Sequence, residues 1–145
     1  MIAQARTEEL YALVPCAIEY TDKIPQMKFN ANHWLPFWSR MIKSGDGVVF
    51  MDWQIDKITG GIGGIKYPCP LSGRMTAVEM FWYTAEANRG AGLRLYSKFK
   101  KWAIEQGCER IAMVYLPCSM PEKLKRFYER EGLSLIEMHY EGPLL

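Results

Sequence analysis

The pattern of hydrophobic and polar positions along the chain predicts alternating helices and strands. Hydrophobic residues at helical spacing indicate helices, and short β-branched or aromatic runs bounded by turn residues indicate strands. The expected elements are helices at 7–20 and 31–45, strands at 47–56, 58–68 and 75–83, a helix at 92–106, a strand at 109–116, a helix at 120–132 and a strand at 133–145. Strands that first neighbour one another and then alternate with helices predict an α/β fold, with a mixed β-sheet flanked by α-helices on both faces.

Proline and glycine positions set the expected limits of the helices. Thr7 is the expected N-cap of the first helix, and Pro15 is expected to kink or end it. Pro36 is expected to break the second helix, whereas Gly45 and Gly107 are expected to end the helices that precede them.

The hydrophobic spacing also predicts which faces are buried. One stripe is expected along the helix at 92–106, from Leu95, Phe99, Trp102 and Ala103. In the helix at 120–132, Leu124 and Phe127 are expected to face inward. The glycines of TGGIGGIKY, residues 59–67, are interpreted as part of a strand whose missing side chains allow close packing.

The composition is that of one globular domain spanning residues 1–145. Hydrophobic content of 49% and charged content of 23% are ordinary, and the net charge of +2 is too small to indicate nucleic acid or an anionic membrane as a partner. The sequence shows no secretory signal and no apolar stretch of the roughly 20 residues that cross a bilayer. Four cysteines without CxxC or zinc spacing predict free, buried thiols in a cytoplasmic protein and no metal site.

A glycine-containing loop in TAEANRGAGLRLY, residues 84–96, is the strongest indication of a ligand. A strand that leads through glycines into a helix presents backbone N–H groups and the positive end of the helix dipole to an anion. Positive side chains accumulate after the loop, at Arg89, Arg94, Lys98, Lys100 and Lys101. These features fit a phosphate, and simple turn or capping glycines are the alternative. A Rossmann loop is disfavoured because Leu95 occupies the third glycine position, and no P-loop sequence is present.

The stretch from residue 78 to residue 135 resembles the GNAT superfamily of acetyl-CoA-dependent N-acyltransferases. The similarity rests on VEMFWYTAEANRGAGLRLYSKFKKWAIEQG and KRFYEREGLSLIEM, which match the family's strand, pyrophosphate loop, long helix and FYE-x-x-G helix. Starting the loop motif at Ala87 places Gly90 and Gly92 at its two small-residue positions, although the family carries Gln or Arg where Ala87 stands. The resemblance implies a single-domain GNAT-like fold with acetyl-CoA as co-substrate.

The resemblance also implies which residues bind acetyl-CoA. Met80 and Trp82 fall where family members offer backbone groups to the pantetheine amides, and Thr84 directly follows the same expected strand. The pyrophosphate is expected at the loop and the helix start, formed by Arg89, Gly90, Ala91, Gly92, Leu93 and Arg94.

Two side chains are candidates for the chemistry of acyl transfer. Tyr128 in RFYEREG matches the family's tyrosine that protonates the coenzyme A thiolate, and aromatic packing is the alternative role. Glu79 is the only acid in the apolar stretch TAVEMFWYT. It is a candidate base or amine-binding group, with a solvated strand residue or an internal salt bridge as alternatives.

The acceptor is expected to lie beside the N-terminal helices, where Trp34, Phe37 and Trp38 form either core or an aromatic wall. The predicted enzyme transfers an acetyl or small acyl group from acetyl-CoA to a primary amine, by direct attack in a ternary complex. The sequence leaves open the identity of the small-molecule or peptide acceptor, the acyl length and the oligomeric state, with a homodimer among the options. A catalytically silent CoA-binding protein and an assembly or interaction domain are the alternatives.

Overall fold

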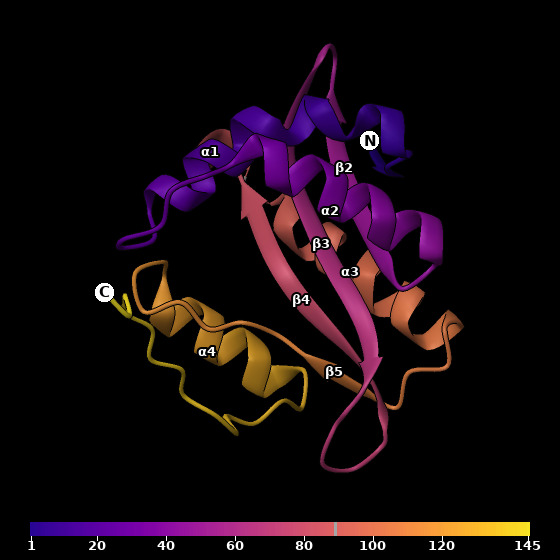
Figure 1. Cartoon of the computed structure of the whole chain (residues 1–145), viewed down its shortest axis with the longest axis vertical. Helices are drawn as coiled ribbons and strands as arrows, with labels where there is room; N and C mark the ends of the chain where they lie inside the picture. The colour runs from indigo at the N-terminus through magenta and orange to yellow at the C-terminus, as the bar shows by residue number, and fades with distance from the viewer. Residues whose placement is uncertain (89) are drawn as a thin grey trace. The chain divides into compact units, whose positions relative to one another are not determined.

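The computed structural model describes residues 1–88 and 90–145, so the expectation for Arg89 lies outside the described residues. Two compact units are distinguished, Met1–Val114 and Tyr115–Leu145, and each is considered by itself. The first unit contains the β-sheet and most of the helices (Figure 1).

The described part of the first unit holds a five-stranded sheet in the order β1-β2-β3-β4-β5. Its strands are β1 (Ile2–Gln4), β2 (Gly47–Gln54), β3 (Lys57–Pro68), β4 (Met75–Thr84) and β5 (Arg110–Ala112). Strands β1 to β4 pair antiparallel with their neighbours, whereas β5 pairs parallel with β4. The sequence does not predict β1, because its 3 residues are too few to give a periodic signal.

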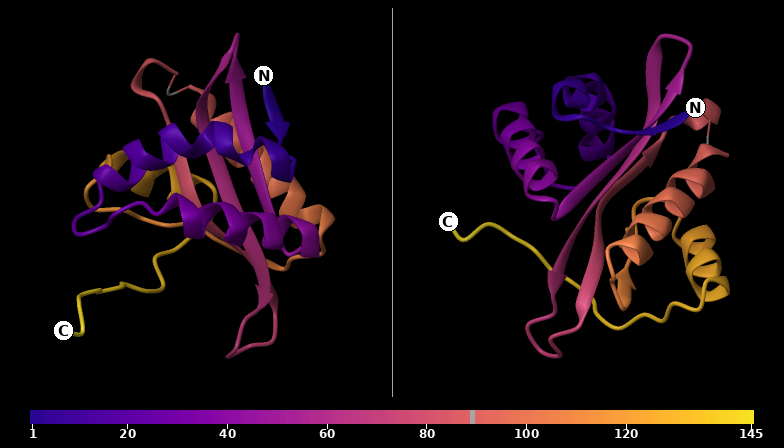
Figure 2. Two further views of the ribbon diagram at one scale, coloured as in Figure 1. Left: turned by 45° about the horizontal axis from the view of Figure 1, so that its top comes forward. Right: turned by 90° about the vertical axis from the view of Figure 1, so that its right-hand side faces the viewer.

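Helices cover both faces of this sheet (Figure 2). The 3-10 helix η1 (Thr7–Leu13) and the helices α1 (Val14–Asp22) and α2 (Ala31–Ser44) lie on one face, and α3 (Ala91–Glu105) lies on the other. A short 3-10 helix, η2 (Glu86–Asn88), leads from β4 to α3. The second unit contains α4 (Pro121–Arg130). The predicted class, a mixed sheet flanked by helices on both faces, is confirmed.

Two expectations about helix limits, those for Thr7 and Pro36, are wrong. Arg6 rather than Thr7 is the N-cap of η1. The helix expected at 7–20 is interrupted next to Pro15 as predicted, since η1 ends at Leu13 and Pro15 lies in the first turn of α1. Proline suits that position because its fixed φ is helical and the N–H it lacks would have no partner there. Pro36 lies inside a continuous α2, where packing of the helix on the sheet offsets the lost hydrogen bond. Gly45 and Gly107 do end their helices, both with φ in the left-handed region.

The end of the predicted sheet also differs from expectation. β5 covers Arg110–Ala112 instead of 109–116, and residues 133–145 form no strand. Alternating hydrophobic residues indicate a strand, but a strand forms only where its backbone groups find a paired neighbour. In this last segment Leu135, Ile136 and Tyr140 are exposed.

The two faces of the sheet bury separate hydrophobic clusters. On the α1 and α2 face, Leu10, Leu13 and Trp38 pack with Met51 of β2. On the other face, the predicted stripe of α3 is buried against strand residues. That cluster contains Val48, Phe50, Ile62, Ala77, Leu95, Phe99, Trp102 and Ala103.

The glycines of β3 permit the close packing that the sequence predicts. A Cβ at Gly63 would lie 2.2 Å from the Phe81 ring, and one at Gly64 would lie 2.3 Å from the Phe99 ring. These rings lie on opposite faces of the sheet, since Phe81 packs with the α1 and α2 cluster and Phe99 with the α3 cluster. The space that side chains at Gly63 and Gly64 would need is therefore filled by the rings of Phe81 and Phe99.

Replacing Gly64 with alanine is expected to lower the free energy of unfolding by about 1–3 kcal/mol, because a packed core accommodates an added methyl group poorly. Phe99 is fully buried, and the carbonyl oxygen of Val78 would lie 2.8 Å from the new Cβ. Denaturant unfolding measures the change. Gly90→Ala is the matched control, since its Cβ would meet nothing within 4 Å. Equal midpoints for the Gly64→Ala variant and the wild type would contradict this packing.

Candidate active site

Strands β4 and β5 part halfway along β4. Their pairing ends at Val78 and Ala112, whereas β4 continues to Thr84. Beyond the split, the N–H of Val114 donates a hydrogen bond of 2.9 Å to the carboxylate of Glu79. In the described part of the chain, β4 from Glu79 onward has β3 as its only ladder partner. β5 is therefore shorter than predicted, and among the described residues one edge of β4 is left without a ladder partner from Glu79 onward.

A β-bulge at Met80 lies at the same level of β4. Gly63 pairs with Phe81 and Gly64 pairs with Glu79, so Met80 is the extra residue. A bulge reverses the alternation of side chains and re-aims them, a device that is frequent next to active sites. Simple alternation would place Ala77 and Phe81 on the same face, whereas Ala77 packs with the α3 cluster and Phe81 with the α1 and α2 cluster.

Glu79 is a buried carboxyl group at this split. It is 2% exposed, and burial raises its pKa to about 7 against the opposing effect of the Val114 N–H. A solvated strand residue is therefore the wrong description of Glu79. A carboxyl group with a pKa near neutrality can take up and release a proton at physiological pH. Its role as base or amine-binding group remains a prediction.

The glycine loop leads into α3 as the sequence predicts. Gly90 is the N-cap, with φ of −61°, and within residues 1–88 and 90–145 no side chain caps the first turn. A Cβ at Gly90 would meet nothing within 4 Å, and one at Gly92 would approach Trp82 and Thr84 at 3.6 Å. Ala91 and Gly92 are buried, whereas Leu93 and Arg94 are exposed. The first N–H groups of a helix lack intrahelical partners, so this end can bind an anion.

A buried polar cluster, which the sequence did not predict, anchors the loop to the sheet. The side-chain amide of Asn88 donates to the carboxylate of Asp52 at 2.7 Å and to the hydroxyl of Thr59 at 2.8 Å. Burial disfavours ionisation of Asp52, but hydrogen bonds from Gln54, the N-terminal ammonium and Asn88 outweigh it and lower its pKa. Asp52 is fully buried. An aspartate inside the apolar run GVVFMDWQ was the available signal.

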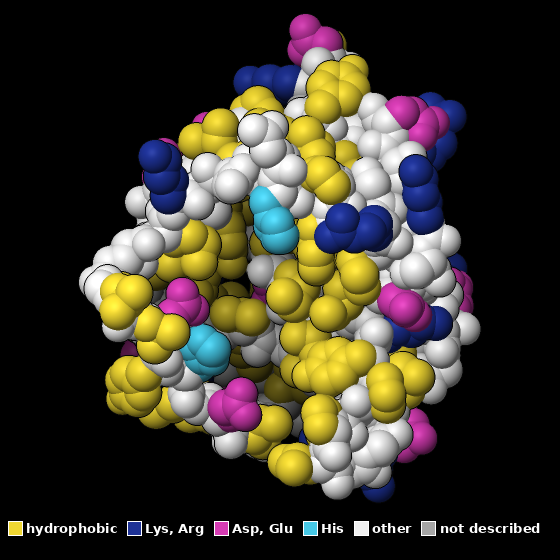
Figure 3. Space-filling model, viewed as in Figure 1, with side chains coloured by type: hydrophobic (Ala, Val, Ile, Leu, Met, Phe, Trp, Pro, Cys, Tyr) yellow, Lys and Arg dark blue, Asp and Glu magenta, His cyan; other side chains and the backbone are white. Residues whose placement is uncertain are grey.

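A cavity of about 250 Å³ lies on the α1 and α2 face of the sheet. Figure 3 shows hydrophobic side chains gathered around a hollow in this face. The three aromatic residues predicted for the acceptor side, Trp34, Phe37 and Trp38, all line the cavity, with Met80 and Phe81 on the β4 side. Trp38 is buried, and Trp34 and Phe37 are half-buried, so these rings are both core and cavity wall.

Comparison with known proteins identifies the family. The sequence matches the acetyltransferase (GNAT) family over residues 9–133. The chain belongs to the GNAT acetyltransferase family. No curated protein matches it.

Solved structures with the GNAT fold are similar over almost the whole chain. A probable acetyltransferase is 19% identical with a TM-score of 0.76, covering 100% of this chain and 98% of that one. An aminoglycoside acetyltransferase from an uncultured soil metagenomic sample is 15% identical with a TM-score of 0.77, covering 100% and 98%. AAC(6′)-Iy, solved with the bisubstrate analogue CoA-S-monomethyl-acetylneamine, is 14% identical with a TM-score of 0.74, covering 99% and 97%. At these identities the likeness shows the fold alone.

The tyrosine of the GNAT motif lies in α4, within the second unit. Tyr128 is the buried residue of this helix, at 9% exposure, and Leu124 and Phe127 are only half-buried. The expectation that Leu124 and Phe127 are the inward-facing pair is thus incomplete. The rings of Phe127 and Tyr128 lie 5.9 Å apart, and the Tyr128 carbonyl accepts a hydrogen bond from the N–H of Leu133. Its role as an acid remains a prediction.

Other features of this GNAT protein bear on its chemistry. All four cysteines are free, but only Cys16 is buried, so the expectation of buried thiols is wrong for the others. Among the described residues, no cluster of three or more histidine, cysteine or acidic side chains is arranged to hold a metal. The described helices include none with the length and apolar character of a membrane span.

Proposed function

We propose that residues 1–145 act as an N-acyltransferase domain that moves an acetyl or small acyl group from acetyl-CoA to a primary amine. The observation that carries this proposal is the buried Glu79 carboxyl group, with a pKa of about 7, at the split between β4 and β5. Membership of the GNAT acetyltransferase family supports the reaction class.

Two local features are compatible with acetyl-CoA as the donor. The N-terminus of α3 has space around Gly90 and uncapped backbone donors, which suit a pyrophosphate. The edge of β4 beyond Val78, which is not paired with β5, and the bulge at Met80 provide strand backbone to which an extended ligand can bind. We assign Met80, Trp82 and Thr84 to the pantetheine and the residues from Gly90 to Arg94 to the pyrophosphate.

Direct transfer requires the protein to manage two protons. Acetyl-CoA, when bound, supplies the thioester carbonyl carbon, to which the amine nitrogen bonds as the C–S bond breaks. Glu79 takes the proton of the ammonium, directly or through water, since an ordinary amine with a pKa near 10.4 is almost wholly charged at pH 7. Tyr128 gives its hydroxyl proton to the departing sulfur, and the second proton of the attacking nitrogen, lost as the neutral amide forms, returns through water to the Tyr128 oxygen. The products are an amide and coenzyme A as the thiol.

Replacing Gly90 with valine is expected to weaken CoA binding at least tenfold, about 1.4 kcal/mol, because a branched side chain blocks the approach of a phosphate to the backbone. The fold itself has space at this position, so the loss can be assigned to the ligand. Calorimetry with CoA measures the affinity, which should also fall as salt rises. Gly142→Val, at another open glycine, is the control. Unchanged affinity in the Gly90→Val variant would remove the loop from the site.

The reaction itself is tested by incubation with acetyl-CoA and a panel of amines. Formation of coenzyme A should depend on the amine, and it should be followed by chromatography, because the exposed thiol of Cys118 would react with thiol reagents. A catalytically silent CoA-binding protein is the alternative, favoured by Ala87 at the position where the family carries Gln or Arg. CoA binding without amine-dependent turnover would support that alternative.

A further inference from the structure

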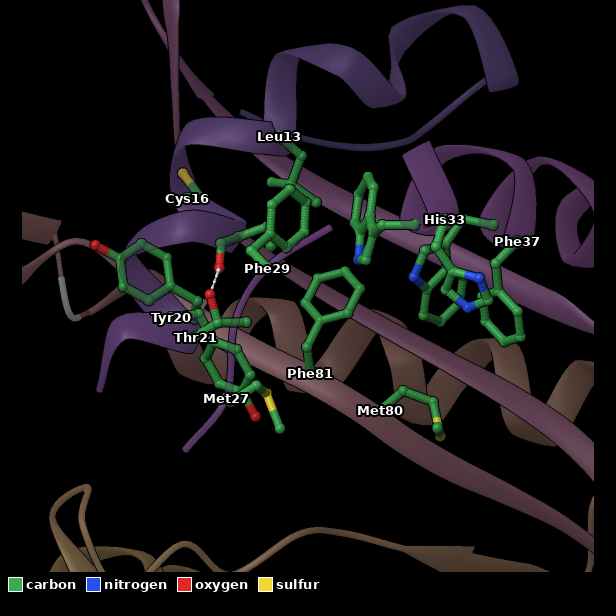
Figure 4. Close-up of a pocket in the computed structure, with 15 residues that line it drawn as sticks. Leu13, Cys16, Tyr20, Thr21, Met27, Phe29, His33, Phe37, Met80 and Phe81 are labelled. Carbon is green, nitrogen blue, oxygen red and sulfur yellow. Dashed lines mark hydrogen bonds between the residues drawn. The ribbon is translucent and has the colours of Figure 1, made fainter. Parts of the chain in front are cut away.

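Aromatic rings from three segments form the walls of the 250 Å³ cavity. Phe29 comes from the loop between α1 and α2, Trp34, Phe37 and Trp38 come from α2, and Phe81 comes from β4. Figure 4 shows Phe81 directed from β4 into the cavity, with His33 and Phe37 side by side on α2. The ring centroids of Trp38 and Phe81 are 5.4 Å apart, and those of Trp34 and Phe81 are 6.0 Å apart. These rings form a continuous apolar surface.

Several polar groups of the lining are already engaged within the protein. The hydroxyl of Thr21 donates to the carbonyl oxygen of Ala17 at 3.0 Å. The thiol of Cys16 donates to the carbonyl oxygen of Ile58 at 3.5 Å, and the hydroxyl of Tyr83 donates to the Glu19 carboxylate. Among the described residues that line the cavity, none is aspartate, glutamate, lysine or arginine. Apart from His33, the described lining therefore offers mainly apolar contact, and it offers no carboxylate.

This lining selects against acceptors with several positive charges. A buried ammonium group is costly unless a carboxylate pairs with it, and here no lining carboxylate is available. The cavity is also smaller than the range of about 300–1,000 Å³ that is typical of sites for drug-sized ligands. An apolar surrounding favours the neutral form of an amine, which is the form that attacks a thioester.

We propose that the acceptor is a small primary amine with one aromatic or branched apolar body, which occupies this cavity and directs its nitrogen toward β4 at Met80. Acetylation of this amine rests on the proposed function, whereas binding of the amine in the cavity does not. Met80 is suited to contact the amine end of the acceptor, because it lines the cavity and also lies on the bulge of β4 next to Glu79. Its flexible thioether can adapt to aromatic ligands.

Two kinds of measurement with the full chain test this proposal. Acetylation of phenethylamine and isoamylamine is compared with that of spermidine and sisomicin, at equal acetyl-CoA concentration. Calorimetry with phenethylamine alone measures binding without turnover. We expect kcat/KM for the apolar amines to exceed that for the polycations at least tenfold. The ring of Phe29 is half-buried in the protein alone, and loss of an aromatic ring that a ligand covers typically weakens binding by tenfold or more. Phe29→Ala should therefore raise KM and the calorimetric Kd for phenethylamine at least tenfold, with KM for acetyl-CoA unchanged.

Two further variants separate a cavity effect from a general one. Tyr11→Ala removes an exposed ring that does not line the cavity. It should change neither KM nor the calorimetric Kd for phenethylamine. His33→Glu places a carboxylate on the cavity lining in the first turn of α2, where an acid suits the helix N-terminus. This variant should shift the preference toward spermidine.

The outcomes distinguish this proposal from the proposed function. Binding of phenethylamine that Phe29→Ala weakens, without acetylation of any amine, would support the cavity assignment and contradict the transferase. Acetylation of spermidine or sisomicin in preference to the apolar amines would overturn the cavity assignment and leave the transferase intact. Absence of phenethylamine binding, or equal binding by wild type and Phe29→Ala, would also overturn it.

Discussion

Replacing Glu79 with glutamine is expected to lower kcat by about 10²–10⁴-fold while the affinity for CoA stays near that of the wild type. The amide keeps an oxygen that can accept the Val114 N–H, so the split between β4 and β5 should persist. What is lost is the ability to accept a proton from the amine. Wild-type activity should rise as pH passes about 7, the pKa of Glu79. The defect of the variant should be largest above a pH of about 7, where Glu79 is ionised while most of the amine is still charged, because at lower pH the protonated wild-type carboxyl group cannot act as a base either.

The same substitution is expected to change how stability depends on pH. Burial raises the pKa of Glu79 from its ordinary value of 4.5 to about 7, so the folded protein retains a proton that the unfolded chain releases between these values. The stabilisation that the protonated Glu79 contributes to the folded state is therefore completely present below pH 4.5. It is lost as the pH rises from 4.5 to about 7. The loss amounts to about 3 kcal/mol. Glu79→Gln should lack this decline.

Thermal unfolding between pH 4 and pH 9, and kcat over the same range, provide the two readouts. Glu105→Gln is the control, because Glu105 is an exposed acid on α3. A Glu79→Gln variant with normal kcat but an altered stability profile would assign Glu79 a structural role at the split. Parallel stability profiles for wild type and variant would contradict the burial of an ionisable group at this position.

Replacing Tyr128 with phenylalanine is expected to slow the chemical step by about 10²–10⁴-fold, or roughly 2.7–5.5 kcal/mol of barrier. The hydroxyl is proposed to meet a sulfur whose negative charge develops only as the C–S bond breaks, so the lost interaction belongs to the transition state. KM for acetyl-CoA should therefore stay nearly constant while kcat falls. Phenylalanine retains the ring at this buried position, so the fold should be preserved.

Because Tyr128 is buried, the alternative to a role as general acid is a role in packing alone. Single-turnover kinetics distinguish these two roles. Product release can limit steady-state turnover and hide a slower chemical step, so the pre-steady-state rate is the relevant measurement. Tyr140→Phe serves as the control, because Tyr140 is exposed at 93%. A single-turnover rate unchanged by Tyr128→Phe would leave Tyr128 as a packing residue.

The sequence by itself determined the elements whose signals are local. The run MTAVEMFWY specified β4, and hydrophobic residues at helical spacing specified α3 and its buried stripe. The sequence also placed Gly90 and Gly92 at the start of a helix, from the order of a strand, a glycine loop and a helix. This was possible because all of these signals lie within a short stretch of neighbouring residues. The family resemblance and the fold class followed from these same elements. Glu79 and Tyr128 were named from their positions in such motifs.

Only the tertiary structure decided what depends on pairing and packing between distant segments. The bulge at Met80 arises from the register between β3 and β4, which hydrophobic alternation does not encode. The raised pKa of Glu79 comes from burial, and its hydrogen bond from the N–H of Val114 joins two residues that are far apart in sequence. The apolar cavity likewise exists because α2 lays its aromatic residues against Phe81 across β3, whose glycines leave space for that ring.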